Sequence, residues 1–476
     1  MEEIINIVNN IIWSPVLVVL LVLAGLYFTI RTRCVQLRQL PLMVRLLFGK
    51  GRQKREKNAL SSFQAFWVAL SGRVGTGNIV GVATAIAIGG PGAVFWMWTI
   101  AFLGASTAFT ESTLASKYHY KHNGVLRGGP AVYISEGLHS PFLGKLFAIL
   151  TVIGYGMLLV LVQSNSISVA VENSFHIRPI VSGVVVAAVL GLVIIGGITR
   201  IANVASMITP FMAVAYILMS FVIIAANMEN IPHMFALIFS SAFGINPAFG
   251  GIFGSTIAMG VKRGLFSNEA GEGGGAIVSA SADVDHPAKQ GLVQAFSVYI
   301  DTLFVCTATA LMILSTGCYN VYDASGNVIV ENAPELGSNY TAYTQSAIDS
   351  VFNGVGGAFV AVALIFFVFT TIIAYYFYAE SSIVFLFSGK GKVHNKNKKE
   401  RVVLNIYKFL ILVIFVLGVL TSSETVWKMG DIGVGLTLWI NIIALLILFP
   451  EALELLNDLE RKLKKSKKRL TAQRLH

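Results

Sequence analysis

The sequence predicts an all-α integral membrane protein, and two general features support this fold class. Of its 476 residues, 55% are hydrophobic and only 12% are charged, a composition outside the range of soluble globular domains. Its apolar segments, such as Val16–Ile30 and Leu404–Leu420, are long and continuous, whereas the strands of a membrane β-barrel are short and alternating. We therefore expect a multi-pass helical protein of the cell membrane.

About eleven transmembrane helices are expected if each span takes about 20 apolar residues. Each is an apolar segment of spanning length between polar or glycine-rich loops, and in chain order they are 13–30, 60–88, 91–115, 143–170, 180–196, 205–227, 248–280, 290–315, 356–387, 403–420 and 426–449. The segments 60–88 and 248–280 are longer than an upright span and rich in glycine. Since glycine disfavours a helix interior, we expect an interruption in each.

The charges of the loops set the predicted orientation. Lys and Arg concentrate in alternate loops, which are 31–57, 117–145, 199–203, 283–289, 390–401 and the tail after Pro450. The longest of the other loops, Thr316–Asn353, has four acidic residues and no Lys or Arg. Because cytoplasmic loops carry the excess of basic residues, we expect the N-terminus outside and the C-terminus in the cytoplasm. The net charge of +11 then belongs to loops that face anionic membrane lipid, and no nucleic acid partner is expected.

The two ends of the chain are expected to flank the main helical bundle. Residues 1–58 read as one extra transmembrane helix without a signal-peptide cleavage site, followed by a basic cytoplasmic linker. Residues 450–476 alternate Leu with Lys, Arg and Glu in a helical pattern. We expect this amphipathic basic tail to lie along the inner leaflet, and the alternative is a helix that docks on a partner.

The helices between these ends are expected to form a five-plus-five inverted repeat, with 59–227 as the first half and 248–449 as the second. The two interrupted helices are five helices apart, so they cross the membrane in opposite directions. In secondary transporters, paired interrupted helices at corresponding positions mark a transport site near the middle of the membrane.

The first interruption, Ser71–Gly81, contains four glycines, Arg73 and Asn78 within an apolar segment. Backbone that leaves the helix at membrane depth must be buried or line a water-filled cavity. We expect Gly75 and Gly77 to offer backbone contacts to a ligand and Asn78 a side-chain contact. Close helix packing is the alternative role of the glycines, but it leaves Arg73 and Asn78 unexplained.

The second interruption lies in Lys262–Gly275, which contains four charged residues and five glycines. Ser267 and Asn268, which are neutral, are the expected ligand contacts there. Charged groups within spans pair with one another or face a cavity. The predicted ion pairs therefore join Arg73, Lys262 and Arg263 to Glu269, Glu272 or Glu111.

Three further polar positions lie within apolar helices. Thr370 and Thr371 offer hydroxyl oxygens which, with carbonyls of the first interruption, would suit a sodium ion, although a Thr hydroxyl can also bond to its own helix. Gln163 is expected either to close the ligand pocket or to bond to a neighbouring helix. Asp301 is a lone membrane acid that would bind a proton or ion, or form a structural ion pair.

No enzymatic site is expected. The histidines fall in the loops and the tail, and the three cysteines lack the spacing of metal ligands. The loops are too short for a catalytic domain. We expect neither catalysis nor an organic cofactor.

Two motifs resemble the alanine or glycine:cation symporter family over about residues 58–450. They are Ser71–Ile86, continued by Gly89–Ala93, and Gly264–Gly271. The resemblance implies sodium- or proton-coupled uptake of small neutral amino acids on the inverted-repeat fold of the neurotransmitter:sodium symporters. It also implies that Gly75, Thr76, Gly77 and Asn78 bind the amino acid and that Ser71, Val74, Thr370 and Thr371 bind sodium. The chain departs from the family pattern at Gly271–Gly275.

The expected function is secondary active symport of alanine or glycine with sodium by alternating access, and Gln163 and Phe266 would limit the size of the pocket. Two alternatives remain open. A proton-coupled symporter would use Glu111, Glu269 or Asp301 as its titrating group. A passive channel or uniporter would share the interruptions but would need no ion site.

Overall fold

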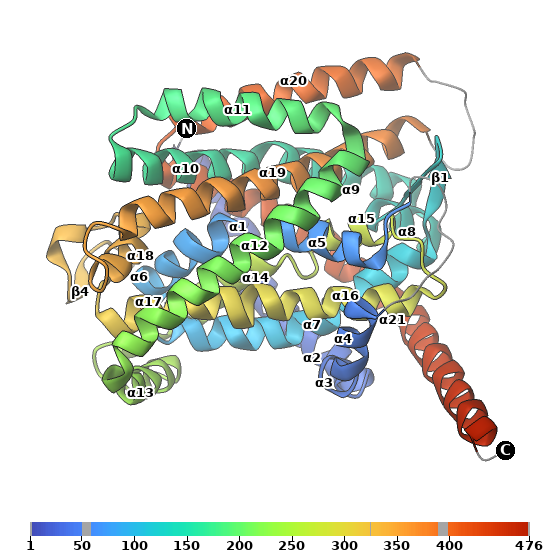
Figure 1. Ribbon diagram of the computed structural model, residues 1–476, viewed down its shortest axis with the longest axis horizontal. Coiled ribbons are helices and arrows are strands. Elements are labelled where there is room, and N and C mark those ends of the chain that lie inside the picture. Colours follow the sequence, from blue (N-terminus) through green and yellow to red (C-terminus); the bar gives the residue numbers. More distant parts are fainter. Residues whose placement is uncertain (1, 50–58, 324, 389–397, 475–476) are drawn as a thin grey trace.

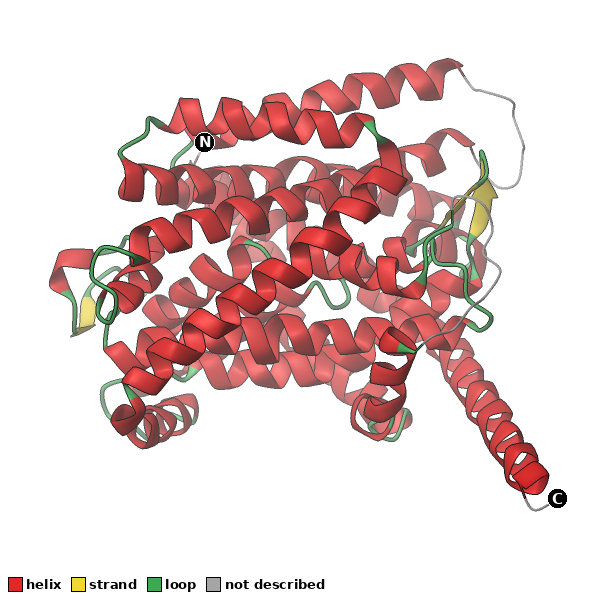
Figure 2. Ribbon diagram, viewed as in Figure 1, coloured by secondary structure: helices red, strands yellow, loops and turns green. Residues whose placement is uncertain are grey.

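The computed structural model describes residues 2–49, 59–323, 325–388 and 398–474. Parts of two predicted cytoplasmic loops, 50–58 and 389–397, lie outside the described residues, as do residues 1, 324 and 475–476. The described chain is a bundle of helices with two short hairpins (Figures 1 and 2). The predicted all-α class is confirmed.

The first half of the chain contains the following elements. They are α1 (Glu2–Ile12), α2 (Pro15–Arg31), α3 (Val35–Arg38), α4 (Leu40–Phe48), α5 (Ser62–Arg73), the π-helical η1 (Gly77–Gly81), α6 (Val82–Gly89), α7 (Ala93–Lys117), the hairpin β1 (Tyr120–His122) and β2 (Val125–Arg127), α8 (Pro130–Gly137), α9 (Pro141–Ile153), the π-helical η2 (Gly154–Leu158), α10 (Leu159–Phe175), α11 (Pro179–Ile195) and α12 (Gly197–Ala226).

The second half continues with these elements. They are η3 (Met228–Asn230), α13 (Ile231–Ala242), η4 (Gly250–Ile252), α14 (Phe253–Asn268), α15 (Gly274–Ser279), α16 (Pro287–Val298), the π-helical η5 (Tyr299–Cys306), α17 (Thr307–Thr316), the hairpin β3 (Asn320–Tyr322) and β4 (Val328–Glu331), η6 (Pro334–Leu336), α18 (Tyr340–Asp349), α19 (Gly356–Ser388), α20 (Lys398–Leu420) and α21 (Ser423–Arg474).

Each predicted transmembrane segment contains a helix, but the segments differ in length. Among the described residues, eight helices are long and apolar enough to cross a membrane, and Gly77–Gly89 and Pro179–Ile195 are shorter apolar helices. The two interrupted segments divide into short halves, and α14 carries two cations, so neither has one long apolar helix. The number of spans therefore stays a prediction.

The two interrupted helices lie side by side in opposite directions. The first runs from α5 through residues 74–76 into η1 and α6, and the second runs from α14 through residues 269–273 into α15. The first half of one packs against the second half of the other, since α15 contacts α5 and α14 contacts α6 (Figure 1). This is the antiparallel arrangement that an inverted repeat requires. The division of the chain into two repeats remains a prediction.

The loops contain more structure than the sequence predicts. The linker after α2 forms α3 and α4, α13 lies between the predicted repeats, and the long acidic loop forms the β3–β4 hairpin and α18. The hairpin, α3 and α18 carry polar residues as loops do, whereas α4 and α13 are apolar but, at 9 and 12 residues, are shorter than a span of about 20 residues.

The C-terminal tail is continuous with the last helix, because α21 runs past Pro450 without a break (Figure 1). Leu456 and Leu459 of the tail are 2% exposed and pack in a cluster that includes Val35 and Met43. Arg38 pairs with Glu460 at 2.6 Å. This part of the tail therefore docks on the protein itself, and the placement of the tail along the inner leaflet stays a prediction.

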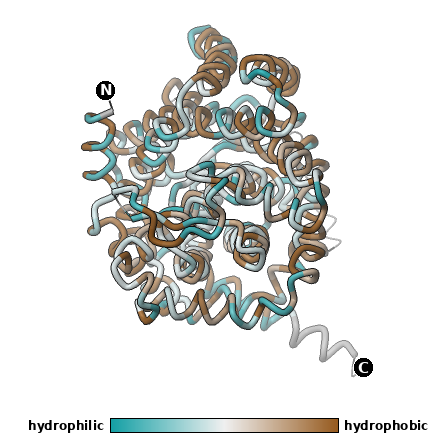
Figure 3. The backbone as a smooth tube through the Cα atoms, turned by 90° about the vertical axis from the view of Figure 1, so that its left-hand side faces the viewer, coloured by the Kyte–Doolittle hydropathy of each residue, from teal (hydrophilic) through white to brown (hydrophobic). Residues whose placement is uncertain are grey.

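The outer helices expose large apolar side chains. Leu192 of α11, Phe211 of α12 and Phe409 of α20 are each more than 60% exposed. Hydrophobic residues also mark the outer helices in Figure 3. Apolar surface on this scale is typical of contact with a membrane.

Candidate functional site

The first interruption is a buried turn held by its own side chains. The Gly75 N–H donates to Asn78 Oδ1 at 2.8 Å. A Cβ at Gly75 would lie 2.6 Å from Thr371 Oγ1, and one at Gly77 would lie 3.1 Å from the ring of Phe266. These close approaches explain why glycine stands at both positions.

The turn releases two backbone carbonyls. In a continuous helix the Ser71 carbonyl would accept from the Gly75 N–H and the Val74 carbonyl from the Asn78 N–H. Here the Gly75 N–H bonds to the Asn78 side chain, and the Asn78 N–H bonds to the Gly75 carbonyl. The oxygens of Ser71 and Val74 are therefore free of their usual helical donors.

Both released carbonyls face Thr371 of α19. Thr371 Oγ1 lies 2.9 Å from the Ser71 oxygen and 3.2 Å from the Val74 oxygen. It also lies 2.8 Å from the carbonyl of Phe367 in its own helix. A hydroxyl has one hydrogen, so it cannot satisfy all three oxygens at once. These uncharged oxygen donors suit a hard cation such as sodium.

Thr370 is placed differently from Thr371. Its hydroxyl lies 3.1 Å and 3.0 Å from the carbonyls of Phe366 and Phe367 in its own helix, and 3.8 Å from Met212 Sδ. No hydrogen bond joins Thr370 to the first interruption in the part of the chain that the structure describes. The structure therefore unites three of the four predicted sodium ligands.

Gln163 of α10 bonds to the first interruption, and this is the expected bond to a neighbouring helix. Its Oε1 accepts from the Thr76 N–H at 3.1 Å and from Thr76 Oγ1 at 2.8 Å. The predicted ligand residues Thr76 and Gln163 are thus in direct contact.

Asp301 of η5 connects the two interruptions. Its Oδ1 accepts from Asn78 Nδ2 at 2.7 Å, and its Oδ2 accepts from Ser267 Oγ at 2.9 Å and Thr302 Oγ1 at 2.7 Å. Among the described residues it has no cation within ion-pair distance, so the expected structural ion pair of Asp301 is corrected. Hydroxyl and amide donors replace the cation.

Asn268 and Phe266 occupy the end of α14. Asn268 Oδ1 accepts from the Ala270 N–H at 3.0 Å, while its buried Nδ2 has no partner. The ring of Phe266 lies 5.0 Å from the ring of Trp427 in α21, and the Arg263 guanidinium lies over both rings. Phe266 therefore lies between Gly77 and Trp427, a residue that no sequence pattern singled out.

The predicted partners of two cations of α14 were wrong. Lys262 and Arg263 both pair with Asp431 of α21, at 2.6 Å and 2.7 Å, and not with Glu111, Glu269 or Glu272. Asp431 lies on α21 close to Lys262 and Arg263, whereas the glutamates bond to other groups. An isolated acid within a predicted span usually has a charged partner, and this rule would have identified Asp431 as a candidate for an ion pair.

Arg73 also differs from its predicted ion pairing. Its Nη1 donates to Ser297 Oγ and, at 3.3 Å, to the Gln294 carbonyl. Its Nε and Nη2 have no hydrogen-bond partner, and no carboxylate of the described residues lies within 4 Å of the guanidinium. The helix end at Arg73 directs Nη1 toward α16 and leaves the glutamates farther away.

The three glutamates accept from neutral groups instead of cations. Glu269 accepts from Tyr378 at 3.4 Å, Glu272 from Tyr155 at 3.0 Å and Glu111 from Asn441 at 3.3 Å.

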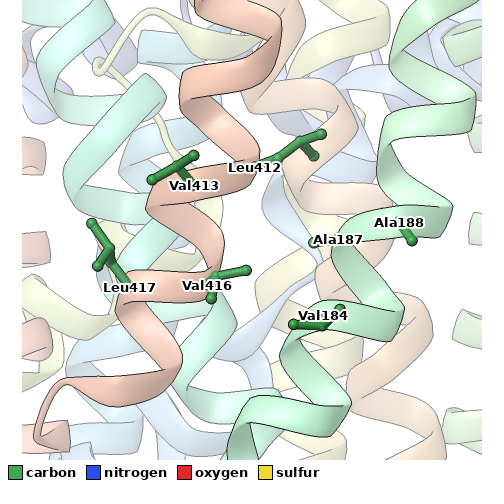
Figure 4. Close-up of a pocket in the computed structure, with 7 residues that line it drawn as sticks. All are labelled: Val184, Ala187, Ala188, Leu412, Val413, Val416 and Leu417. Carbon is green, nitrogen blue, oxygen red and sulfur yellow. The ribbon is translucent and has the colours of Figure 1, made fainter.

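A surface groove lies away from these residues, between α11 and α20 (Figure 4). It is lined only by aliphatic side chains, which are Val184, Ala187, Ala188, Leu412, Val413, Val416 and Leu417. Because a zwitterionic ligand needs polar partners, this groove does not fit the predicted substrate.

Known proteins are similar to this chain in sequence and in fold. Residues 1–473 match the sodium:alanine symporter family. The carrier protein YrbD of Bacillus subtilis (strain 168) is 49% identical over 98% of this chain and 93% of its own length. The sodium/proton-dependent alanine carrier protein of Bacillus sp. (strain PS3) is 45% identical over 87% of this chain and 91% of its own length.

The fold has a solved counterpart in a Na⁺-coupled sialic acid symporter, seen in a substrate-bound outward-open state. The two share a TM-score of 0.50 at 13% identity, over 87% of this chain and 82% of that one. At this identity the likeness concerns the fold alone. Together with the match along residues 1–473, it supports one assignment: the chain is a multi-pass membrane protein that belongs to the sodium:alanine symporter family.

Proposed function

We propose that this chain is a secondary active symporter that takes up alanine or glycine together with sodium by alternating access. The observation that carries the proposal is the pair of released carbonyls, Ser71 and Val74, which face the hydroxyl of Thr371. A passive channel or uniporter needs no such set of oxygen donors. The sodium/proton-dependent alanine carrier from strain PS3, at 45% identity, supports alanine as the substrate.

Sodium would bind between the first interruption and α19, held by the oxygens of Ser71, Val74 and Thr371. Thr370 would act from the same helix, after a change of side-chain rotamer. The ion would join α19 to the end of α5 and so order the turn that follows. Each sodium ion that crosses the whole membrane potential contributes about 2.3 kcal/mol per 100 mV to uptake.

The amino acid would bind on the adjacent side of the same turn. Its binding residues are expected to be Gly75, Thr76, Gly77, Asn78, Gln163, Phe266, Ser267 and Asn268. The close approach of Phe266 to Gly77 leaves little room for a side chain, which favours alanine and glycine over larger amino acids. The unpartnered Nδ2 of Asn268 is a free donor for the substrate carboxylate.

The test is uptake of radiolabelled alanine into proteoliposomes that contain the purified protein. We expect accumulation with an inward sodium gradient and little without it, and we expect unlabelled glycine to compete better than glutamine. Protein-free liposomes are the control. Equal uptake with and without the sodium gradient would overturn sodium coupling.

A further inference from the structure

Three buried glutamates and one buried arginine lie near the second interruption. A Cβ at Gly274 would lie 2.8 Å from Glu269 Oε2 and one at Gly275 would lie 2.6 Å from Arg73 Nη2, while Asn441 bonds both to Glu111 and to the Gly271 carbonyl. The glutamate cluster consists of Glu111 of α7 with Glu269 and Glu272 of the second interruption, and Arg73 is the cation that acts on its charges. The three carboxylates are at most 1% exposed, and Arg73 is 2% exposed. Water therefore does not solvate these charges.

The cluster has too few cations for its carboxylates. Arg73 attracts all three, while Glu269 and Glu111 repel Glu272. With every group ionised, the three carboxylates and Arg73 together would carry two negative charges in excess. Burying an unpaired charge is costly, and a buried carboxyl avoids that cost by taking up a proton.

Polar atoms without a hydrogen-bond partner indicate the same shortage of donors to the carboxylates. Oε1 of Glu111, Oε1 of Glu269 and Oε1 of Glu272 have no partner, and neither have Nε and Nη2 of Arg73. A proton on one carboxyl would supply a donor that a second carboxylate oxygen can accept.

The remaining polar and titratable groups around Glu269 and Glu272 add no positive charge. They are Tyr155 of η2, Tyr375 and Tyr378 of α19, and Asp301 of η5. Next to Glu111 lie Asn441 of α21 and Tyr133 of α8. A metal ion is not the favoured occupant, because no group of three or more His, Cys, Asp or Glu side chains in the described chain has the arrangement of a metal site.

The backbone at the cluster is irregular. Glu269 has φ of 53°, and Gly271 and Gly273 have φ of 89° and 98°. A non-glycine residue in this left-handed region is uncommon, and such residues concentrate at functional sites and switch regions. The glutamates therefore lie on a segment whose conformation is unlike that of the helices on either side.

We propose that Glu269 and Glu272 form a proton-binding site, shared with Glu111, which is loaded and emptied during the transport cycle. This proton site would be part of the proposed symporter. It rests on the proposed function only in assuming that the transport cycle carries an amino acid. A proton from the water on one side adds to a carboxylate oxygen, giving a carboxylic acid. The same proton returns to the water on the other side, and no other bond changes.

The test compares the chain with Glu272→Gln in proteoliposomes, at equal sodium on both sides and with an acidic outside. We expect the proton gradient to raise alanine uptake several-fold in the unmodified protein. We expect this stimulation to be lost in Glu272→Gln, because the amide cannot bind or release a proton, and to be partly restored in Glu272→Asp. Glu229→Gln, on the exposed η3, is the matched control and should respond like the unmodified protein.

A second measurement separates proton binding from transport. The infrared band of a buried carboxylic acid should be present in the purified protein and should be weakened in Glu272→Gln, even if that variant does not transport. An unchanged band together with an unchanged response to the proton gradient would overturn the proton site. Failure of sodium-driven uptake in the unmodified protein would overturn the proposed sodium coupling instead, and the infrared result would still decide the proton site.

Discussion

At the scale of single residues, the neighbouring threonines of α19 have different surroundings. Thr371 reaches the released carbonyls of Ser71 and Val74, whereas Thr370 bonds within its own helix. We predict that Thr371→Ala raises the sodium concentration for half-maximal uptake about tenfold, which corresponds to about 1.4 kcal/mol of lost binding energy. Thr370→Ala should have a smaller effect. The measurement is alanine uptake as a function of sodium concentration, with choline as the replacing cation.

The threonine pair is also a matched control for folding. Both side chains are fully buried and differ by one position in the same helix, so loss of packing should affect the two variants alike. Equal sodium dependence of the two variants would contradict the assignment of Thr371 as the principal hydroxyl ligand.

The roles of single residues were predictable where a local sequence pattern indicated them. The glycines and Asn78 predict the first interruption, and Thr371 predicts a polar site in α19, because polar or helix-breaking residues are costly in an apolar span. The partners of charged residues were not predictable in this way. Lys262 and Arg263 lie within about two helical turns of Glu269 in the sequence, but they pair with Asp431, which is more than 160 residues away. Only the packing of α14 against its neighbours decides between such partners.

At the scale of elements, the ion pairs of Asp431 attach α14 to α21. Removing one member of a buried pair leaves the other charge uncompensated. Because two cations depend on the carboxylate, we predict that Asp431→Asn destabilises the protein by about 3–5 kcal/mol. The apparent melting temperature of the purified protein in detergent should fall accordingly. Glu424→Gln breaks an exposed pair of the same helix with Lys428 and should change stability by less than about 1 kcal/mol.

An equal melting temperature for Asp431→Asn and Glu424→Gln would contradict this structural role.

The helices were predictable from the sequence where they are long and hydrophobic. The long apolar helices were identified because nothing else accounts for such segments. The elements α3, α18 and the two hairpins were not identified because they are short and carry polar residues, and α4 was not because it is apolar but only 9 residues long.

At the scale of the whole molecule, the antiparallel packing of the two interrupted helices links their ends. Leu60, before α5, bonds to the chain after α15: its N–H donates to the Ser281 carbonyl, and its carbonyl accepts from the Asp283 N–H, both at 3.0 Å. The predicted orientation places this contact at the cytoplasmic end. Sequence patterns predicted that these helices cross in opposite directions but could not predict this contact, because its bonds involve only backbone atoms.

Alternating access requires this end of the protein to open during the cycle, so a covalent link across it should stop transport. Leu60 and Ala282 form a parallel β-bridge. Adjacent bridged backbones lie about 4.8 Å apart, within the range of about 4.4–6.8 Å that a disulfide requires between Cα atoms. We predict that the double variant Leu60→Cys with Ala282→Cys loses sodium-driven uptake on oxidation and regains it on reduction. Each single variant should be insensitive to the oxidant, and transport by the cross-linked protein would show that the two helix ends need not separate.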